Sequence, residues 1–232
     1  MQGDCPMLKG KVIEVKDLTV LQTKQMYSIM TKYYDNISEG VFCTDLLKKR
    51  DVVLLCNEDD DIYGFTTLAI FPHDEQTQLI FSGDTIIEKE YWGKNDLSHA
   101  WIINALSHAE KFNGKTYWLL LAKGYKIYKF LHTFFNKFYP RVDTETPQEI
   151  QKIIDKFSTE QFGKKYHNGI YTAGKDYLKE EFAQIDETKL KDKNTAFFLE
   201  KNPNYAKGDE LICITELCEK NINRIGKRVL GR

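Results

Sequence analysis

The sequence predicts an α/β protein, of the α+β type with a mixed sheet, and two observations support that prediction. Residues 77–112 begin with an apolar, β-rich segment at 79–87 and continue through a short turn into an amphipathic helix. A second apolar strand at 116–122 and a second helix at 125–139 follow in the same order. This order predicts two neighbouring parallel strands joined by a right-handed crossover.

Five elements are predicted before this region. Residues 11–19 predict a first strand, and residues 21–37 and 41–49 predict two helices. The apolar runs at 51–57 and 62–70 are separated by an acidic segment, so they predict an antiparallel hairpin with a solvated turn.

The helix after the central strand is predicted from one apolar face. Its apolar residues recur at three- and four-residue spacing, as a helix packed against a sheet requires. They are Leu97, Trp101, Ile102, Ala105, Leu106 and Ala109. The next strand, at 116–122, is apolar almost throughout, which is typical of a strand covered on both faces.

The character of the chain changes after residue 141. We expect a helix at 148–157, a loop at 163–174, a short helix at 176–182, a mixed segment at 188–200, a turn-rich link at 202–209 and a strand at 210–217 that returns to the main sheet. The tail from residue 218 is basic, and we expect it to be poorly ordered. The predicted organisation is therefore a core at 1–141, a helical and loop insertion at 142–209, and a final strand and tail at 210–232 that complete the same domain.

Composition excludes several function classes. The chain has 33 basic and 34 acidic residues, and this near balance gives no field to attract nucleic acid or an anionic membrane. No run reaches the length of a membrane span, and the first residues lack the apolar region of a secretory signal. The five cysteines show neither CxxC spacing nor pairing with nearby histidines. We therefore expect a reduced, cytoplasmic protein without a metal site.

Two features of the central region point to chemistry. The turn Tyr91-Trp92-Gly93-Lys94-Asn95-Asp96 directly precedes a helix, where backbone N–H groups and the helix dipole suit a phosphate. An ordinary capped loop is the alternative interpretation. Asp84 is the one carboxylate within the apolar central strand, so we predict that it serves as a base or as an anchor for an amine.

The order of the predicted elements resembles that of the GNAT acyltransferase superfamily. The resemblance covers residues 11–141 and the strand at 210–217, and it depends on element order more than on identity. The segments SGDT…YWGKNDL, LLLAKGYKIYKFL, FFNKFYPR and NPNYAKGDELICI are also similar to a little-described group of bacterial GNAT-like proteins.

This resemblance implies a GNAT-like, mostly antiparallel sheet with splayed central strands, flanked by helices, with a C-terminal helical insertion before the last strand. An acyl-pantetheine arm would lie between the splayed strands. It implies backbone donors near Thr85, Ile86 and Ile87, with the pyrophosphate of coenzyme A held over Trp92, Gly93, Lys94, Asn95 and Asp96. The turn departs from the family pattern in three places. Trp92 stands where Arg or Gln is usual, Asn95 where Gly is usual, and Leu97 where a small residue is usual.

The implied activity is transfer of an acyl group from acetyl-CoA or a longer acyl-CoA to the amine of a small-molecule or peptide acceptor. In the family, the acid that reprotonates the leaving thiolate is often a Tyr early in the helix after strand five. Tyr125 and Tyr128 both match that position, and His132 shares a helical face with Tyr128. We expect Asp84, Tyr128 and His132 to be the catalytic residues. The alternative interpretation is that the aromatic stripe of this helix is core.

Three other interpretations remain open. An acyl carrier protein could supply the thioester, with the basic residues Lys48, Lys49 and Arg50 meeting its acidic surface. A catalytically inactive GNAT-shaped binding protein would account for the departures in the turn. A metal-dependent hydrolase is disfavoured because no ligand motif is clustered in the sequence. The acceptor, the acyl length and the oligomeric state are not specified by the sequence.

Overall fold

The computed structural model describes residues 8–94, 96–172, 185 and 190–231. One eight-stranded sheet runs through it in the order β1-β2-β3-β4-β5-β8-β7-β6. The strands are β1 (Lys9–Glu14), β2 (Asp51–Cys56), β3 (Ile62–Asp74), β4 (Thr77–Ile87), β5 (Lys115–Ala122), β6 (Tyr166–His167), β7 (Ile170–Thr172) and β8 (Asp209–Glu216). All neighbouring strands are antiparallel except β4 and β5, which are parallel. This topology confirms the predicted mixed and mostly antiparallel sheet.

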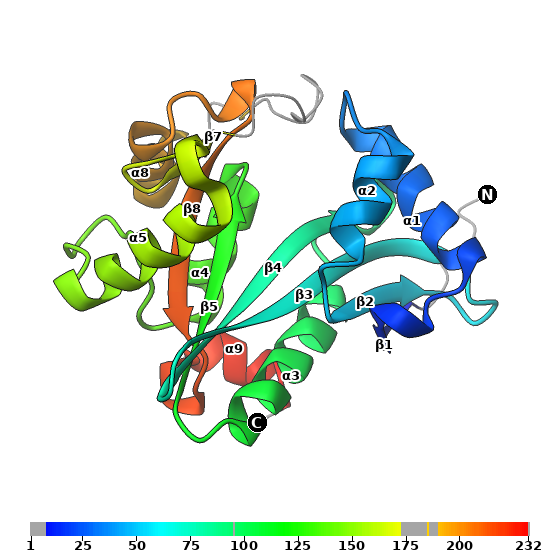
Figure 1. Ribbon diagram of the computed structural model, residues 1–232, viewed down its shortest axis with the longest axis horizontal. Helices are drawn as coiled ribbons and strands as arrows, with labels where there is room; N and C mark the ends of the chain where they lie inside the picture. Colours follow the sequence, from blue (N-terminus) through cyan, green and yellow to red (C-terminus); the bar gives the residue numbers. More distant parts are fainter. Residues whose placement is uncertain (1–7, 95, 173–184, 186–189, 232) are drawn as a thin grey trace.

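Helices cover both faces of the sheet. They are α1 (Val20–Tyr33), α2 (Glu39–Leu46), α3 (Asp96–Lys111), α4 (Tyr125–Phe134), α5 (Gln148–Phe162), α8 (Lys193–Lys201) and α9 (Arg224–Val229). Successive residues of β2 point to opposite faces of the sheet: Val52 packs with α1 and α2, whereas Val53 packs with α3. On β5, Leu119 packs with α5 and Leu120 packs with the α3 and α4 layer. Helices α1, α2 and α5 therefore lie on one face and α3, α4 and α8 on the other (Figure 1).

The sheet divides into two halves that lie close together at one end and diverge at the other (Figure 1). One half consists of β1–β4 with α1 and α2, and the other consists of β5–β8 with α4, α5 and α8. Strands β4 and β5 form the boundary between the halves. Among the described residues, none of the helices combines the length and the apolar character that crossing a bilayer demands.

Helix α4 is shorter than predicted, because it ends at Phe134 rather than at residue 139. The chain then leaves the helix and becomes extended. The backbone N–H of Asn136 donates to the Asn221 carbonyl at 2.8 Å, and Tyr139 exchanges two backbone hydrogen bonds of 2.8 Å with Ile214. These partners are distant in sequence, so the helical pattern at 125–139 could not reveal them.

Three further differences lie in the C-terminal third. Part of the predicted loop at 163–174 is the β6–β7 hairpin, which turns at Asn168 (φ 47°) and Gly169 (φ 83°). The mixed segment contains helix α8. The tail forms helix α9, whose N-cap Asn223 accepts hydrogen bonds from two backbone N–H groups, so the expectation of poor order was wrong. The helix predicted at 176–182 lies outside the described residues.

Candidate functional site

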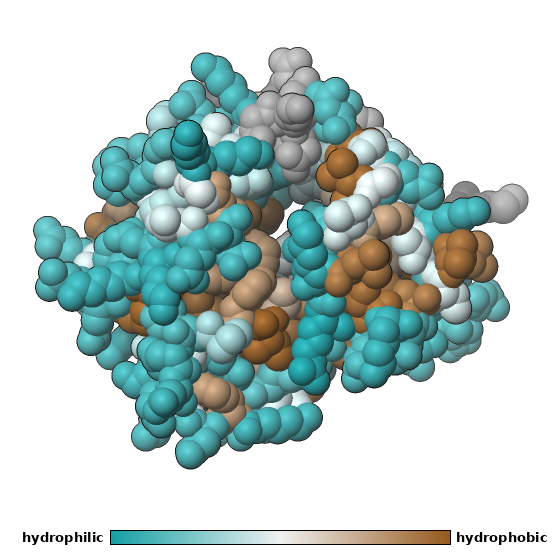
Figure 2. All heavy atoms as spheres, in the orientation of Figure 1, coloured by the Kyte–Doolittle hydropathy of each residue, from teal (hydrophilic) through white to brown (hydrophobic). Residues whose placement is uncertain are grey.

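Strands β4 and β5 part near their carboxyl ends. Their parallel pairing begins at Thr77 with Lys115 and ends at Ser82 with Leu120. Strand β4 continues to Ile87, still paired with β3 but no longer with β5. This arrangement confirms the predicted splay of the central strands. In Figure 2 the surface is hollowed between the two halves of the molecule.

A β-bulge lies on β4 where the strands part. Gly83 and Asp84 together oppose the single residue Thr67 of β3, whereas the pairs before and after them are one to one. A Cβ added to Gly83 would lie 2.7 Å from the Thr67 Oγ1 and 3.0 Å from the Lys49 Cε. Asp84 precedes Ile86 by two residues, and Ile86 packs against the α1 and α2 layer. Both bulge residues therefore face the side of the sheet that carries α2.

Asp84 is a half-buried carboxyl group in a mixed electrostatic environment. Burial raises its pKa above the ordinary value, and the negative charge of Asp45 acts in the same direction. The ammonium groups of Lys49 and Lys123 oppose this increase, with Lys49 the stronger of the two. A carboxylate whose pKa is raised takes up a proton more readily, which is the property of a general base.

The open edge of β4 presents two backbone N–H groups. The Glu88 N–H donates to the Tyr63 carbonyl of β3 at 2.8 Å. Strand alternation then turns the Ile86 N–H toward β3 and the N–H groups of Thr85 and Ile87 toward the open side. Of the three predicted donors, Ile86 therefore directs its N–H to β3, whereas Thr85 and Ile87 direct theirs to the side where β5 no longer pairs.

The predicted phosphate turn follows this open edge after Glu88 and a short 3-10 helix at Lys89–Tyr91. It comprises Trp92, Gly93, Lys94, Asn95 and Asp96, and α3 begins at Asp96. Gly93 has φ +87°, a left-handed conformation that favours glycine, and an added Cβ would have no atom within 4 Å. Trp92 and Lys94 are exposed, and Asn95 lies outside the described residues.

Trp92 connects the turn to the mouth of the slot. Its indole Nε1 donates to the Ile87 carbonyl at 2.7 Å, so it caps the end of the open edge. The Nζ of Lys126, in the first turn of α4, lies 3.9 Å from the centre of the Trp92 ring. The pKa of Lys126 is lowered by partial desolvation and by the charge of Lys89. The mutual repulsion of the Lys126 and Lys89 ammonium groups favours binding of an anion between the turn and the start of α4.

Tyr128 and His132, two of the predicted catalytic residues, lie on the side of α4 that faces α8. Tyr128 is 1% exposed and packs against Phe198, and its hydroxyl donates to the Pro140 carbonyl at 3.0 Å. Burial raises the pKa of Tyr128 far above its ordinary value, so the phenol is a poor acid. Burial lowers the pKa of His132, and the charge that most opposes this decrease is that of Asp192 at the N-cap of α8. Both side chains belong to the packing between α4 and α8.

A buried ion pair that was not anticipated lies at the end of β5. The Nζ of Lys123 is 3.3 Å from the Glu210 Oε1, and each side chain is only 9% exposed. The same ammonium lies 4.9 Å from the centre of the Tyr34 ring, at the end of α1 in the other half of the molecule. Lys123 directly precedes Gly124 in the sequence. The pair exists because β5 and β8 are neighbours.

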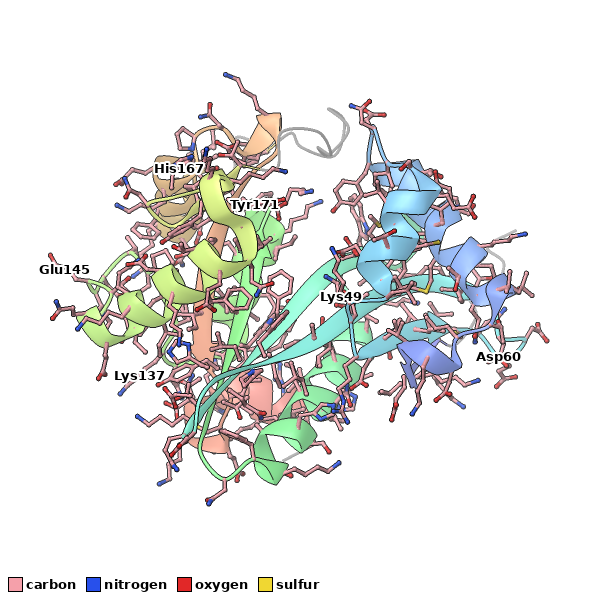
Figure 3. The ribbon with its side chains drawn as sticks, in the orientation of Figure 1. Lys49, Asp60, Lys137, Glu145, His167 and Tyr171 are labelled. Atoms are coloured by element: carbon pink, nitrogen blue, oxygen red, sulfur yellow. The ribbon has the colours of Figure 1, made fainter. Side chains whose placement is uncertain are left out.

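The basic run after α2 does not form a uniform surface. The side chain of Lys48 is 68% exposed and that of Arg50 is 54% exposed, whereas that of Lys49 is 8% exposed. Lys49 belongs to the half with β1–β4 and lies on the side that faces the other half. Tyr171 belongs to that other half (Figure 3). Lys49 is therefore unavailable to the surface of a carrier protein.

The comparisons with known proteins give a likeness in structure alone. No family model matches the sequence, and no curated protein matches it. A GNAT family N-acetyltransferase (YhbS) from Escherichia coli in complex with CoA is 12% identical, with 57% of this chain and 72% of that chain covered and a TM-score of 0.40. An acyl-CoA N-acyltransferase from Pseudomonas aeruginosa is 17% identical, with 62% and 95% covered and a TM-score of 0.41.

A third solved structure is an aminoglycoside acetyltransferase, meta-AAC0020, from an uncultured soil metagenomic sample in complex with sisomicin. It is 14% identical, with 61% of this chain and 93% of that chain covered and a TM-score of 0.43.

Proposed function

We propose that the protein is an acyltransferase of GNAT type, which moves an acyl group from a thioester of coenzyme A to an amine. The observation that carries this proposal is the end of β4–β5 pairing at Ser82 and Leu120, beside a bulge that bears Asp84. An acyl-pantetheine arm can pair with an open strand edge through its amide groups, much as an added strand does. The N–H groups of Thr85 and Ile87 supply that edge.

In the proposed reaction, Asp84 accepts a proton from the acceptor ammonium and leaves a neutral amine. The amine nitrogen attacks the thioester carbonyl and the new C–N bond forms. The nitrogen then loses its second proton to water as the C–S bond breaks. The thiolate leaves and takes a proton. Tyr125 replaces Tyr128 as the proposed acid, because it starts α4 directly after the end of β5. The amide and the free thiol are the products.

Coenzyme A is the preferred donor because cations surround the turn at the mouth of the slot. Lys126 and Lys89 repel each other there, and Lys94 lies beside Gly93 in the turn itself. A diphosphate would relieve that repulsion. Acetyl-CoA and longer acyl-CoA are both included in this proposal. An acyl carrier protein, which presents phosphopantetheine without a diphosphate, remains the alternative donor.

The proposed acceptor is an amine of a small molecule or a peptide, since a carboxylate with a raised pKa suits a group that binds as a cation and reacts after losing a proton. The odd number of cysteines fits a reducing compartment, and we place the activity in the cytoplasm.

The second candidate is a GNAT-shaped binding protein without catalytic activity. The observation that favours it is the placement of Tyr128 in the core, together with Trp92 at a position where the family usually has Arg or Gln. This candidate predicts thioester binding without turnover.

Two measurements test the proposal. Thermal shift with acetyl-CoA, octanoyl-CoA, free coenzyme A and pantetheine measures whether the slot binds, because a ligand of the folded state raises the apparent stability. Detection of free thiol with the same thioesters and a panel of primary amines measures transfer. Binding with amine-dependent thiol release supports the acyltransferase, and binding without release supports the second candidate. If no pantetheine compound causes a shift, the slot does not have the proposed role.

A further inference from the structure

Lys49 is a lysine whose side chain is buried. Its side chain is 8% exposed, although lysine is among the residues least often buried. Lys48, its neighbour in the same basic run, is 68% exposed. Burial of an ammonium is unfavourable unless a partner compensates for the lost hydration, so the contacts of Lys49 indicate what it does.

Three contacts fix the Lys49 side chain over the bulge of β4. The Nζ lies 2.9 Å from the Asp45 Oδ2 of α2. It also lies 5.2 Å from the centre of the Phe81 ring, two residues before Gly83. At Gly83 an added Cβ would come within 3.0 Å of the Lys49 Cε and 3.1 Å of its Nζ. The side chain therefore crosses the strand at the one position where the absence of a Cβ gives it room.

A second polar group lies at the same place. The Thr67 Oγ1 is buried and has no hydrogen-bond partner among the described residues, and an added Cβ on Gly83 would lie 2.7 Å from it. Buried hydroxyl groups usually have a partner. The bulge thus combines a fixed ammonium, an available hydroxyl and the Asp84 carboxyl group on one face of the sheet.

We infer that Lys49 is a positioning residue for the proposed acyl transfer: anchored by Asp45 and laid over Gly83, its ammonium keeps the Asp84 carboxylate ionised where β4 and β5 part. The inference builds on the proposed function, since it assigns a role beside the proposed base. Lys49 does not touch the reacting atoms in this role. It acts through Asp84.

The charged groups around Asp84 support this direction of effect. They are Lys49 and Asp45 from α2 and the turn after it, and Lys123 at the end of β5. Lys123 also faces the buried Glu210, which offsets its charge, whereas Asp45 is 43% exposed and screened by water. Lys49 is the strongest of the groups that oppose protonation of Asp84. Without it, burial would hold the carboxyl group protonated to a higher pH.

The test compares Lys49→Met with the matched control Lys48→Met. Both remove one positive charge close to Asp45, but only the first removes the ammonium over the bulge. The Asp84 side-chain carboxyl is titrated by carbon-detected NMR in the wild-type protein and in both variants, and its signal is assigned with Asp84→Asn. Lys49→Arg keeps the charge, and circular dichroism and thermal unfolding show that each variant is folded.

We expect the titration of Asp84 to move to higher pH in Lys49→Met, to stay unchanged in Lys48→Met, and to return toward wild type in Lys49→Arg. If thiol release is detected, the acid limb of kcat/KM moves in the same direction, because activity is lost as pH falls through the pKa of Asp84. The fall in kcat/KM for Lys49→Met is then about tenfold on the acid limb and small at alkaline pH.

An Asp84 titration that is the same in wild type and Lys49→Met overturns the inference, whether or not an activity exists. A loss of kcat/KM of equal size at every pH also overturns it, because that result indicates a structural role only. A titration that moves in a protein without any thiol release leaves the electrostatic role of Lys49 standing and refutes the proposed function instead. The NMR titration therefore separates the two failures.

Discussion

Replacing Tyr128 by Phe tests whether the α4 aromatic stripe belongs to the core or to the catalytic site. The substitution removes one hydroxyl and leaves the ring in place. The hydroxyl donates to the Pro140 carbonyl at 3.0 Å and Tyr128 is 1% exposed, so water has little access to the space that the lost donor leaves. The structure therefore predicts a loss of stability and an unchanged turnover.

The magnitude follows from leaving the carbonyl of half-buried Pro140 without its donor. A typical net hydrogen bond contributes about 1 kcal/mol, and a buried partner left unsatisfied raises the loss to roughly 1–3 kcal/mol. For a domain of this size, 1 kcal/mol corresponds to about 2–4 °C in Tm. We therefore expect Tyr128→Phe to lower Tm by roughly 2–12 °C.

Tyr27→Phe is the matched control. The Tyr27 hydroxyl also donates to a backbone carbonyl, that of Ile37 at 3.1 Å, but the side chain is only half-buried. Water can replace this donor, so the loss should stay below about 1 kcal/mol. Urea denaturation and thermal unfolding of both variants measure the difference, and thiol release measures turnover. A turnover that falls tenfold or more in Tyr128→Phe, with stability unchanged, would refute the core assignment and restore Tyr128 as an acid.

Three further predictions follow from the same geometry. Asp84→Asn should lower turnover by about 10²–10⁴-fold. Asp84→Asn should also raise the free energy of unfolding at neutral pH. The pKa of Asp84 is higher in the folded protein than in the unfolded chain, so the wild-type protein loses stability as pH rises through these two pKa values. In acid the wild-type carboxyl group is protonated in both states, so the advantage of the variant disappears there. Denaturation at pH 3 and pH 7 checks this sign. Gly93→Ala forces a left-handed alanine, at a cost of about 1–2 kcal/mol. It should weaken coenzyme A more than pantetheine in thermal shift, and equal weakening would count against the phosphate turn. Asn223→Ala removes the α9 cap and should cost about 1 kcal/mol in urea denaturation, whereas no loss would mean that α9 adds little.

The local elements were predictable because their causes lie within a few residues. The apolar strand at 79–87 and the helical spacing from Leu97 to Ala109 define β4 and α3. The β6–β7 hairpin was missed although its signal was present, since Asn168-Gly169 favours the positive φ values of a tight hairpin turn. That error came from weighing the polar, glycine-containing composition of the segment above its turn residues.

The candidate site was predictable only in part. Asp84 could be singled out because one carboxylate in an apolar strand must have a partner or a cavity. Tyr125 and Tyr128 could not be told apart, because both matched the same position in the family pattern. The structure separates them by a single helical turn, which places Tyr128 against Phe198 and leaves Tyr125 at the start of α4.

The sequence by itself determined the order and type of most elements, because hydrophobic periodicity and turn residues act over short distances along the chain. Only the tertiary structure decided which charges are buried. Lys48 and Lys49 are identical and adjacent, yet one is solvated and the other crosses the β4 bulge. Lys123 and Glu210 meet because β5 and β8 pair across a long stretch of sequence. Burial and charge pairing are set by neighbours distant in sequence, and these neighbours determine what a side chain can do.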